Sequence, residues 1–120
     1  MIVTLQDIAN ARSGDKGANS NIGVIAHTEH GYQLLKVILT TKSIEDFFSY
    51  LPLKSVVCYE LPNLCALNFI LYGALGEGGS SSLYLDAQGK ALGQKLLQMV
   101  LPIDETAILK MQRKITLDNP

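Results

Sequence analysis

The stretch that decides the fold reads "ARSGDKGANSNIG" over residues 11–23, and it separates two segments with the character of β-strands. Within residues 2–11, Val3 and Leu5 alternate with polar residues, which is the period of a strand. Residues 21–28 form a β-branched run, apolar on consecutive positions, that fits a central strand. A link rich in glycine and asparagine between such segments predicts a β-hairpin with a long connection.

Beyond residue 30 the chain alternates between helical and strand patterns. Apolar residues three and four positions apart predict helices, and short β-branched or alternating runs predict strands. The segments expected, in chain order, are a helix over 30–39, a short helix over 41–51 with Ser43 as its N-cap, a strand over 55–62, a buried helix over 63–75, a strand over 80–86 and a helix over 91–101. Residues 103–117 fit a helix or an edge strand equally well. The order β-β-α-α-β-α-β-α predicts a two-layer α/β sandwich with helices mostly on one face.

Composition excludes several classes of partner. The 120 residues are 48% hydrophobic and 18% charged, which is typical of one globular domain, and the formal charge of −1 offers no bulk attraction to nucleic acid or to an anionic membrane. The start of the chain lacks the basic and apolar regions of a secretion signal. The most apolar window, residues 64–75, is too short to span a bilayer. We therefore expect a cytoplasmic protein without nucleic-acid or membrane partners.

The glycine-rich stretch is the first candidate binding site. Gly14 and Gly17 bracket Asp15 and Lys16, and glycines allow the close backbone approach that an anion-binding nest of N–H groups needs. Arg12 and Lys16 add two positive charges, and arginine can bond a carboxylate or phosphate twice. The string is not a P-loop, because the lysine precedes the second glycine. The alternative is a plain hairpin connection, in which polar side chains bond their own backbone and Arg12 pairs with Asp15.

A second group of candidates lies further along the chain. Glu60 lies near the end of a predicted strand and Asn63 at the start of the next element, where they could hold a cation or a hydroxyl group. The alternative is structural: Asn63 caps the helix and Glu60 pairs with Arg12 or Lys16. Asn68 interrupts an apolar segment, and a buried amide needs a partner. It therefore either clamps a neighbouring backbone, for which residues 14–21 are the candidate, or points into a site. The candidate ligand- or partner-binding residues are Arg12, Ser13, Gly14, Asp15, Lys16, Gly17, Asn19, Asn21, Glu60, Asn63 and Asn68.

Metal and cofactor chemistry finds little support in the sequence. His27 and His30 lack a third ligand, and Cys58 and Cys65 do not have metal-type spacing, so no metal and no cofactor is expected. The two cysteines are interpreted as free thiols. The second glycine-rich stretch, residues 76–82, could cradle an anion but is more typical of a helix end followed by a turn.

Several motifs together resemble the small domain of the acyclic terpene utilisation (AtuA-like) proteins. They are "ARSGDKG" with "NIGVIA", then "YELPNL" with "ALNF", then "GALGEGG" and "LDAQGK". The resemblance implies the α+β class and a ferredoxin-like fold with about four mostly antiparallel strands, in a domain over residues 1–101 with an extension over 102–120. It also implies a link to terpenoid or branched acyl breakdown, and a large AtuA-like region either in the same chain or beside it.

The sequence and this resemblance lead to one functional hypothesis and one alternative. The hypothesis is a non-catalytic binding or assembly subunit, whose partner is an AtuA-like large subunit, a second copy of itself in a homo-oligomer, or a small anionic metabolite. Unpaired sheet edges favour such association. The alternative is a small enzyme acting on a carboxylate or acyl-CoA, with Arg12 and Lys16 binding charge and Asp15 or Glu60 moving a proton.

Overall fold

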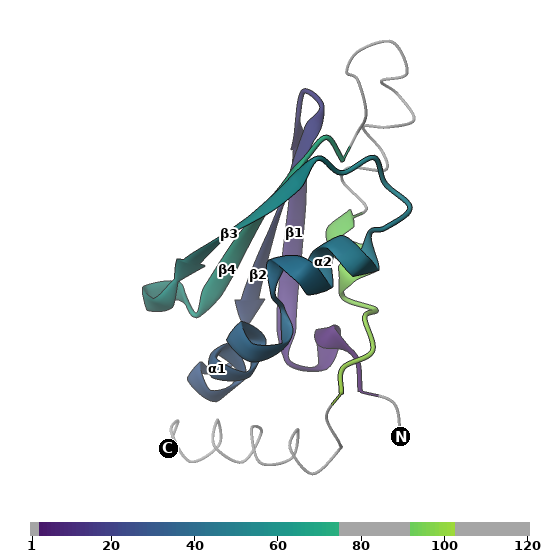
Figure 1. Cartoon of the computed structure of the whole chain (residues 1–120). Helices are drawn as coiled ribbons and strands as arrows, with labels where there is room; N and C mark the ends of the chain where they lie inside the picture. Colours follow the sequence, from purple (N-terminus) through teal and green to yellow (C-terminus); the bar gives the residue numbers. More distant parts are fainter. Residues whose placement is uncertain (1–2, 75–91, 103–120) are drawn as a thin grey trace, which may run out of the picture.

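The computed structural model describes residues 3–74 and 92–102 of the chain (Figure 1). Its elements, in order, are a 3-10 turn η1 (Leu5–Asp7), β1 (Ala9–Lys16), β2 (Asn19–Ala26), α1 (Glu29–Ile38), α2 (Thr41–Phe47), β3 (Ser55–Leu61), a 3-10 turn η2 (Pro62–Leu64) and β4 (Ala66–Tyr72). Residues 92–96 are also helical, within the segment predicted as the last helix. The predicted strand over 80–86, the glycine-rich stretch over 76–82 and the tail over 103–117 lie outside the described residues.

The four strands form one antiparallel sheet with the order β1-β2-β4-β3. Because β2 and β3 both run antiparallel to β4, they run parallel to each other. The two helices α1 and α2 connect them by crossing over one side of the sheet (Figure 1). The predicted α+β sandwich, with a four-stranded antiparallel sheet and helices on one face, is confirmed.

Strand alternation places the core between this side of the sheet and the helices. Ile22, Phe69 and Leu71 point to the helices and are completely buried, whereas the neighbours of Ile22 on β2 are not. Leu35 of α1 and Leu96 of the last helical segment are buried against the same core. The other side of the sheet faces away from the helices.

The predicted buried helix over 63–75 is wrong, because this segment contains the central strand β4. Pro62–Leu64 form a 3-10 turn, and Cys65 adopts a left-handed backbone with a φ of 51°, so the chain reverses directly from β3 into β4. A short apolar run with leucines at 64, 67, 71 and 75 fits helical spacing, but periodicity alone cannot distinguish it from a buried strand. Pairing with strands on both sides decides the outcome.

The predicted long connection over residues 11–23 is also wrong. β1 continues to Lys16 and β2 starts at Asn19, so only Gly17 and Ala18 form the turn. Gly17 has a φ of +64°, which is the backbone conformation that a tight hairpin turn needs and that glycine adopts at low cost. The hairpin itself is confirmed, and β2 is central in the sheet as expected.

Two smaller boundaries also differ from the expectation. The first predicted strand begins late, since residues 5–7 form the 3-10 turn η1 rather than strand. The N-cap of α2 is Thr40, not Ser43. Ser43 is instead the third helical residue of a capping box, in which its hydroxyl accepts a hydrogen bond from the Thr40 amide at 2.8 Å while the Thr40 hydroxyl accepts one from the Ser43 amide at 3.1 Å.

Candidate functional site

The candidate site is the side of the sheet that faces away from α1 and α2, which we call the open face. Within the described parts of the chain, the helices pack on the other side of the sheet. By strand alternation and register the open face is formed by Asn10, Arg12, Gly14, Asn21, Gly23, Ile25, Val57, Tyr59, Leu61, Ala66, Asn68 and Ile70. These positions include four of the predicted site residues.

The open face carries several exposed apolar side chains. Ile25 is 46% exposed, Tyr59 51% and Leu61 41%, and Val57 and Ile70 beside them are half-buried. An antiparallel sheet with one solvated face is expected to alternate apolar residues inward with polar residues outward. Here the outward positions of β3, β2 and β4 carry aliphatic and aromatic side chains instead.

One transverse row of the open face brings predicted and unpredicted residues together. The register pairs Arg12 with Gly23, Gly23 with Asn68, and Asn68 with Tyr59. Directly opposed residues on neighbouring strands point to the same side of the sheet. Arg12 and Tyr59 therefore lie at the two ends of the row, on the two edge strands, with the side-chain-free Gly23 and the half-buried Asn68 between them.

The side chain of Asn68 contacts the predicted hairpin, but through another side chain rather than through the backbone. Its Oδ1 accepts a hydrogen bond from Nδ2 of Asn21 at 3.4 Å, so the amide in β4 clamps β2 from the side of the open face. Asn19 makes a second tie, because its Oδ1 accepts from the Gly73 amide at 2.9 Å just after β4. The hairpin is therefore connected to the centre of the sheet by two asparagine contacts.

Other predicted residues of the glycine-rich stretch are used inside the fold. The Ser20 hydroxyl donates to the carbonyl of Gly14 at 2.8 Å, across the hairpin. Ser13 points to the helices, where its hydroxyl oxygen accepts a hydrogen bond from the Gly93 amide at 2.8 Å. Asp15 pairs with Ser20 in the ladder, and Lys16 pairs through its backbone with Asn19, while the Lys16 side chain lies outside the described part of the structure. The stretch is a hydrogen-bonded hairpin with Gly17 and Ala18 at its turn.

Among the described residues, Arg12 forms no ion pair with a carboxylate. Asp15, three residues along the same strand, points to the opposite side of the sheet. The ion pair that the described residues contain is Lys42–Asp46 on α2, at 3.3 Å. The expected internal pair of Arg12 with Asp15 is thus absent from the described part of the chain. Arg12 instead lines a cleft of about 460 Å³ at the β1 edge, together with Asn10, Ala11, Ile25 and Gln94.

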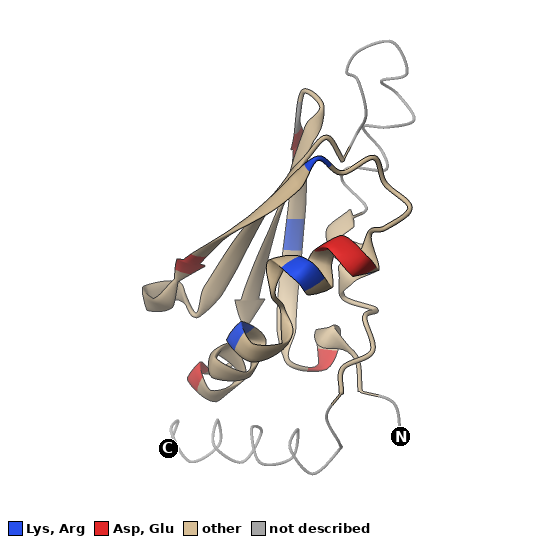
Figure 2. Cartoon of the chain, in the orientation of Figure 1, with Lys and Arg blue, Asp and Glu red and all other residues tan. Residues whose placement is uncertain are grey.

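Glu60 and Asn63 do not join Arg12. β3 and β1 are opposite edges of the sheet, about 14 Å apart for three strand spacings. Glu60 also faces the helix side, whereas Asn63 is exposed in the turn η2. Figure 2 shows the charged residues dispersed over the molecule. The fold therefore does not bring Glu60 and Arg12 together.

Glu60 lies near a different group of side chains, under α1. Burial raises the pKa of Tyr32, and the charges of Glu60, Cys65 and Cys58 add to this effect. Burial, and then Glu60, raises the pKa of the Cys58 thiol. Both cysteines are free thiols, as interpreted from the sequence. A raised thiol pKa lowers the thiolate fraction, so Cys58 is a poor nucleophile at neutral pH.

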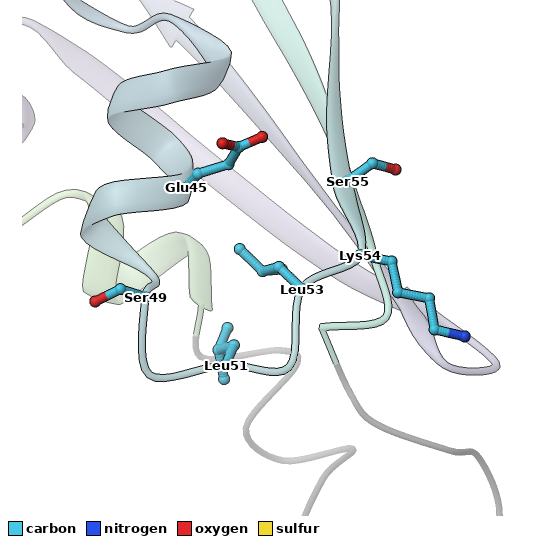
Figure 3. A pocket seen from close by; sticks show the side chains of 6 residues that line it. All are labelled: Glu45, Ser49, Leu51, Leu53, Lys54 and Ser55. Atoms are coloured by element: carbon cyan, nitrogen blue, oxygen red, sulfur yellow. The ribbon is translucent and has the colours of Figure 1, made fainter.

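A second, smaller pocket of about 290 Å³ lies where α2 leads into β3 (Figure 3). The carboxylate of Glu45 points toward Ser55 across Leu53, whereas Lys54 and Ser49 point away from that space. The Glu45 carboxylate and the Lys54 ammonium thus do not converge on a common point. The described residues also contain no group of three His, Cys, Asp or Glu side chains that could hold a metal ion.

The family is decided by the match of the chain to a family model. The model of the AtuA ferredoxin-like domain matches residues 3–102, which is most of the chain. The chain belongs to the AtuA ferredoxin-like domain family. None of the curated proteins and none of the solved structures matches it. The ferredoxin-like expectation for this AtuA ferredoxin-like domain is thereby confirmed, and no helix in its described parts is long and apolar enough to cross a membrane.

Sequence reasoning missed the apolar residues of the open face. Tyr59 and Leu61 alternate with Cys58 and Glu60 in β3, and this alternation is visible in the sequence. It does not show which set faces solvent, because that depends on where the helices pack. Ile25 is likewise recognisable as part of an apolar run but not as an exposed residue.

Proposed function

We propose that this AtuA ferredoxin-like domain is an assembly module that associates with a second copy of itself through the open face. The observation that carries the proposal is the group of exposed apolar side chains on that face, Ile25, Tyr59 and Leu61, with the exposed polar residues Arg12 and Asn21 on the same face. Exposed apolar patches next to polar residues mark protein–protein interaction sites.

The types of residue on the open face also support docking to protein. Tyrosine and arginine are enriched among the residues that dominate binding energy, and Tyr59 and Arg12 are both exposed there. Arginine is more weakly hydrated than lysine and stacks on aromatic rings, so it tolerates burial in an interface. The exposed apolar side chains gain free energy when water is removed, at about 25 cal/mol per Å².

The charge on the open face favours a neutral or self-complementary partner surface. The carboxylates of the four strands, Asp15 and Glu60, both point to the helix side. Burial of an unpaired carboxylate is costly. Docking through the open face avoids this cost, because it does not remove water from any carboxylate of the strands. A second copy presents the same carboxylate-free surface.

The sequence resemblance suggests a second occupant, the large AtuA-like region. In that setting the domain would serve terpenoid or branched acyl breakdown as the assembly part of a larger protein. The two occupants compete for the same residues, so one set of variants distinguishes them. We favour self-association. If the large region binds the open face and a second copy does not, the large region becomes the proposed partner.

The test is sedimentation velocity of the full chain over a wide concentration range. The wild type is expected to form a dimer. Ile25→Lys is expected to shift the equilibrium to the monomer, because dimer formation would bury an ammonium group among the apolar side chains of the open face. Val37→Lys is the matched control, since Val37 is 75% exposed on α1, on the helix side. A wild type that stays monomeric, or equal association in both lysine variants, would overturn the proposal.

A second candidate function is suggested by the cleft at the β1 edge. Arg12 and the amides of Asn10 and Gln94 surround it, with Ile25 as an apolar wall. This combination suits a carboxylate that carries an alkyl chain, such as a small acid or an acyl-CoA. Thermal-shift screening of the wild type and Arg12→Ala against CoA esters and small acids tests it, because a specific ligand stabilises only the wild type.

A further inference from the structure

The order of residues across the open face indicates how two copies would pack together. This inference rests on the proposed function. We infer that two copies pack face to face about a two-fold axis parallel to the strands, so that Arg12 of each copy stacks on Tyr59 of the other. The inference follows from the strand order and register, which fix what each position would meet in a second copy.

The axis places opposite edges of the sheet over each other. The strand order is β1-β2-β4-β3. The two-fold axis runs along the strands, midway between the two sheets and above the boundary of β2 and β4. It places β1 of one copy over β3 of the other copy, and β2 over β4. Residues that share a transverse row then remain in the same row. Sheets packed in this aligned way lie about 10 Å apart.

The central row is complementary to itself under this operation. Its order across the sheet is Arg12, Gly23, Asn68, Tyr59. In the second copy the order is reversed, so Asn68 meets the position of Gly23, which has no side chain and where an added Cβ would make only ordinary contacts, at 3.9 Å, with the Arg12 carbonyl and with Oδ1 of Asn68 of the same chain. Arg12 meets the exposed ring of Tyr59, an arrangement suited to a cation–π contact.

The two neighbouring rows pair exposed side chains with positions that are already partly covered. One row runs Gly14, Asn21, Ile70, Val57, so Val57 meets Gly14 of the second copy and Ile70 meets Asn21. Over Gly14 the space is taken by Asn21 of the same chain, whose Oδ1 would lie 3.2 Å from an added Cβ. The other row runs Asn10, Ile25, Ala66, Leu61, so Leu61 meets Asn10 and the exposed Ile25 meets Ala66, which is buried. The complementarity of this arrangement therefore rests on the central row.

The other face-to-face two-fold arrangement lacks this complementarity. An axis perpendicular to the strands places β1 over β1 and β4 over β4. When this axis passes through the central row, Arg12 approaches Arg12 of the second copy, Asn68 meets Asn68, and Gly23 meets Gly23. Two like charges and two gaps would face each other, which costs electrostatic energy and loses packing contacts.

The test exchanges the pair for two opposite charges. Arg12→Glu and Tyr59→Lys should each raise the dissociation constant of the dimer by about tenfold or more, because each removes both copies of the contact. The double variant, Arg12→Glu with Tyr59→Lys, should recover most of the affinity through two new ion pairs between copies. Residues 12 and 59 lie about 14 Å apart within one sheet, so the recovery cannot come from a pair inside one chain.

Cross-linking provides a second measurement that does not depend on the charge variants. Arg12→Cys and Tyr59→Cys chains are mixed and treated with a short bis-maleimide, and the linked peptides are identified by mass spectrometry. Links between positions 12 and 59 of different chains are expected in the mixture, with none from Val37→Cys chains. Cys58 and Cys65 are replaced by serine in every chain, so that links form only through the introduced thiols.

The outcomes separate this inference from the proposed function. One set of results would overturn the Arg12–Tyr59 geometry but leave assembly through the open face. In it, Ile25→Lys abolishes the dimer, the double charge variant does not recover it, and cross-links join position 12 to position 12. A wild type that remains monomeric at every concentration would overturn both. Recovery in the double variant, together with links between positions 12 and 59, supports the geometry.

Discussion

Replacement of Tyr59 by alanine should weaken self-association strongly while leaving the fold almost unchanged. Tyr59 is 51% exposed, and an aromatic side chain buries about 150–250 Å², so docking can remove on the order of 100 Å² of its surface from water. At about 25 cal/mol per Å² this corresponds to about 2.5 kcal/mol per copy, or about 5 kcal/mol for the two copies of a symmetric dimer.

That figure is an upper limit, because burial is incomplete and alanine keeps part of the contact. A loss of about 2–4 kcal/mol raises the dissociation constant by about 30- to 1000-fold. Sedimentation velocity of Tyr59→Ala and the wild type measures the shift. The free energy of unfolding of the monomer should change by less than about 0.5 kcal/mol, since substitutions at exposed positions have small effects.

Tyr50 supplies the matched control for this prediction. It is 52% exposed, but it lies between α2 and β3 and stacks with Lys95 at 4.7 Å rather than on the open face. Tyr50→Ala removes the same side chain with nearly the same exposure and should leave the dissociation constant unchanged. If the two variants weaken association equally, or if Tyr59→Ala has no effect on a wild type that does associate, the reasoning from the open face is refuted.

Three further predictions concern the fold that carries this face. Asn68→Leu removes the acceptor for Asn21, so hydrogen exchange of the amides of residues 14–21 should accelerate while the circular dichroism spectrum stays the same; unchanged exchange would show that the clamp contributes nothing. Gly73→Ala should lower the free energy of unfolding in urea much more than Gly17→Ala, although both glycines have positive φ. A Cβ at residue 73 would lie 2.8 Å from the Pro52 carbonyl oxygen, whereas a Cβ at residue 17 would meet open space. Gly17→Ala should cost about 1 kcal/mol, and equal losses would contradict the steric argument. Tyr32→Phe removes a buried hydroxyl that makes no hydrogen bond within the described residues, so stability in urea unfolding should stay level or rise slightly. Burial raises the pKa of Tyr32, so folding favours its neutral form. The wild type should therefore lose stability as pH rises above about 10, where the tyrosine of the unfolded chain ionises. Tyr32→Phe should lack this part of the loss of stability at alkaline pH.

Local patterns in the sequence predict the elements whose periodicity is unambiguous. The helix beginning near residue 30 and the strand beginning at residue 55 are confirmed as α1 and β3. Thr28 and Thr40 also cap the two helices, with hydroxyls that accept hydrogen bonds from backbone amides as helix starts require.

The errors arise where long-range pairing competes with local preference. Leu67 and Leu71 are four residues apart and fit a helix, but both point into the core from β4, because the hydrogen bonds of β2 and β3 on either side hold the segment extended. The glycine-rich stretch is predicted as a loop for the same reason. Gly14 and Gly23 are weak strand formers, yet they lie in a ladder that is complete on both sides of the turn.

The site can be predicted only in part, for a similar reason. Arg12 and the contact of Asn68 with the hairpin follow from residue types that need partners or solvent. The separation of Glu60 from Arg12 depends on the strand order, which places their strands at opposite edges. No local pattern encodes that order, and the exposure of Tyr59 depends on it as well.

The most direct test of the open face as a self-association surface is a dilution series of ¹H–¹⁵N correlation spectra of the wild-type chain. Concentration-dependent amide shifts are predicted at open-face positions such as Gly23, Ile25, Asn68 and Tyr59, with none around Val37 on α1. Spectra that do not change with concentration, or changes centred on α1, would contradict self-association through this face.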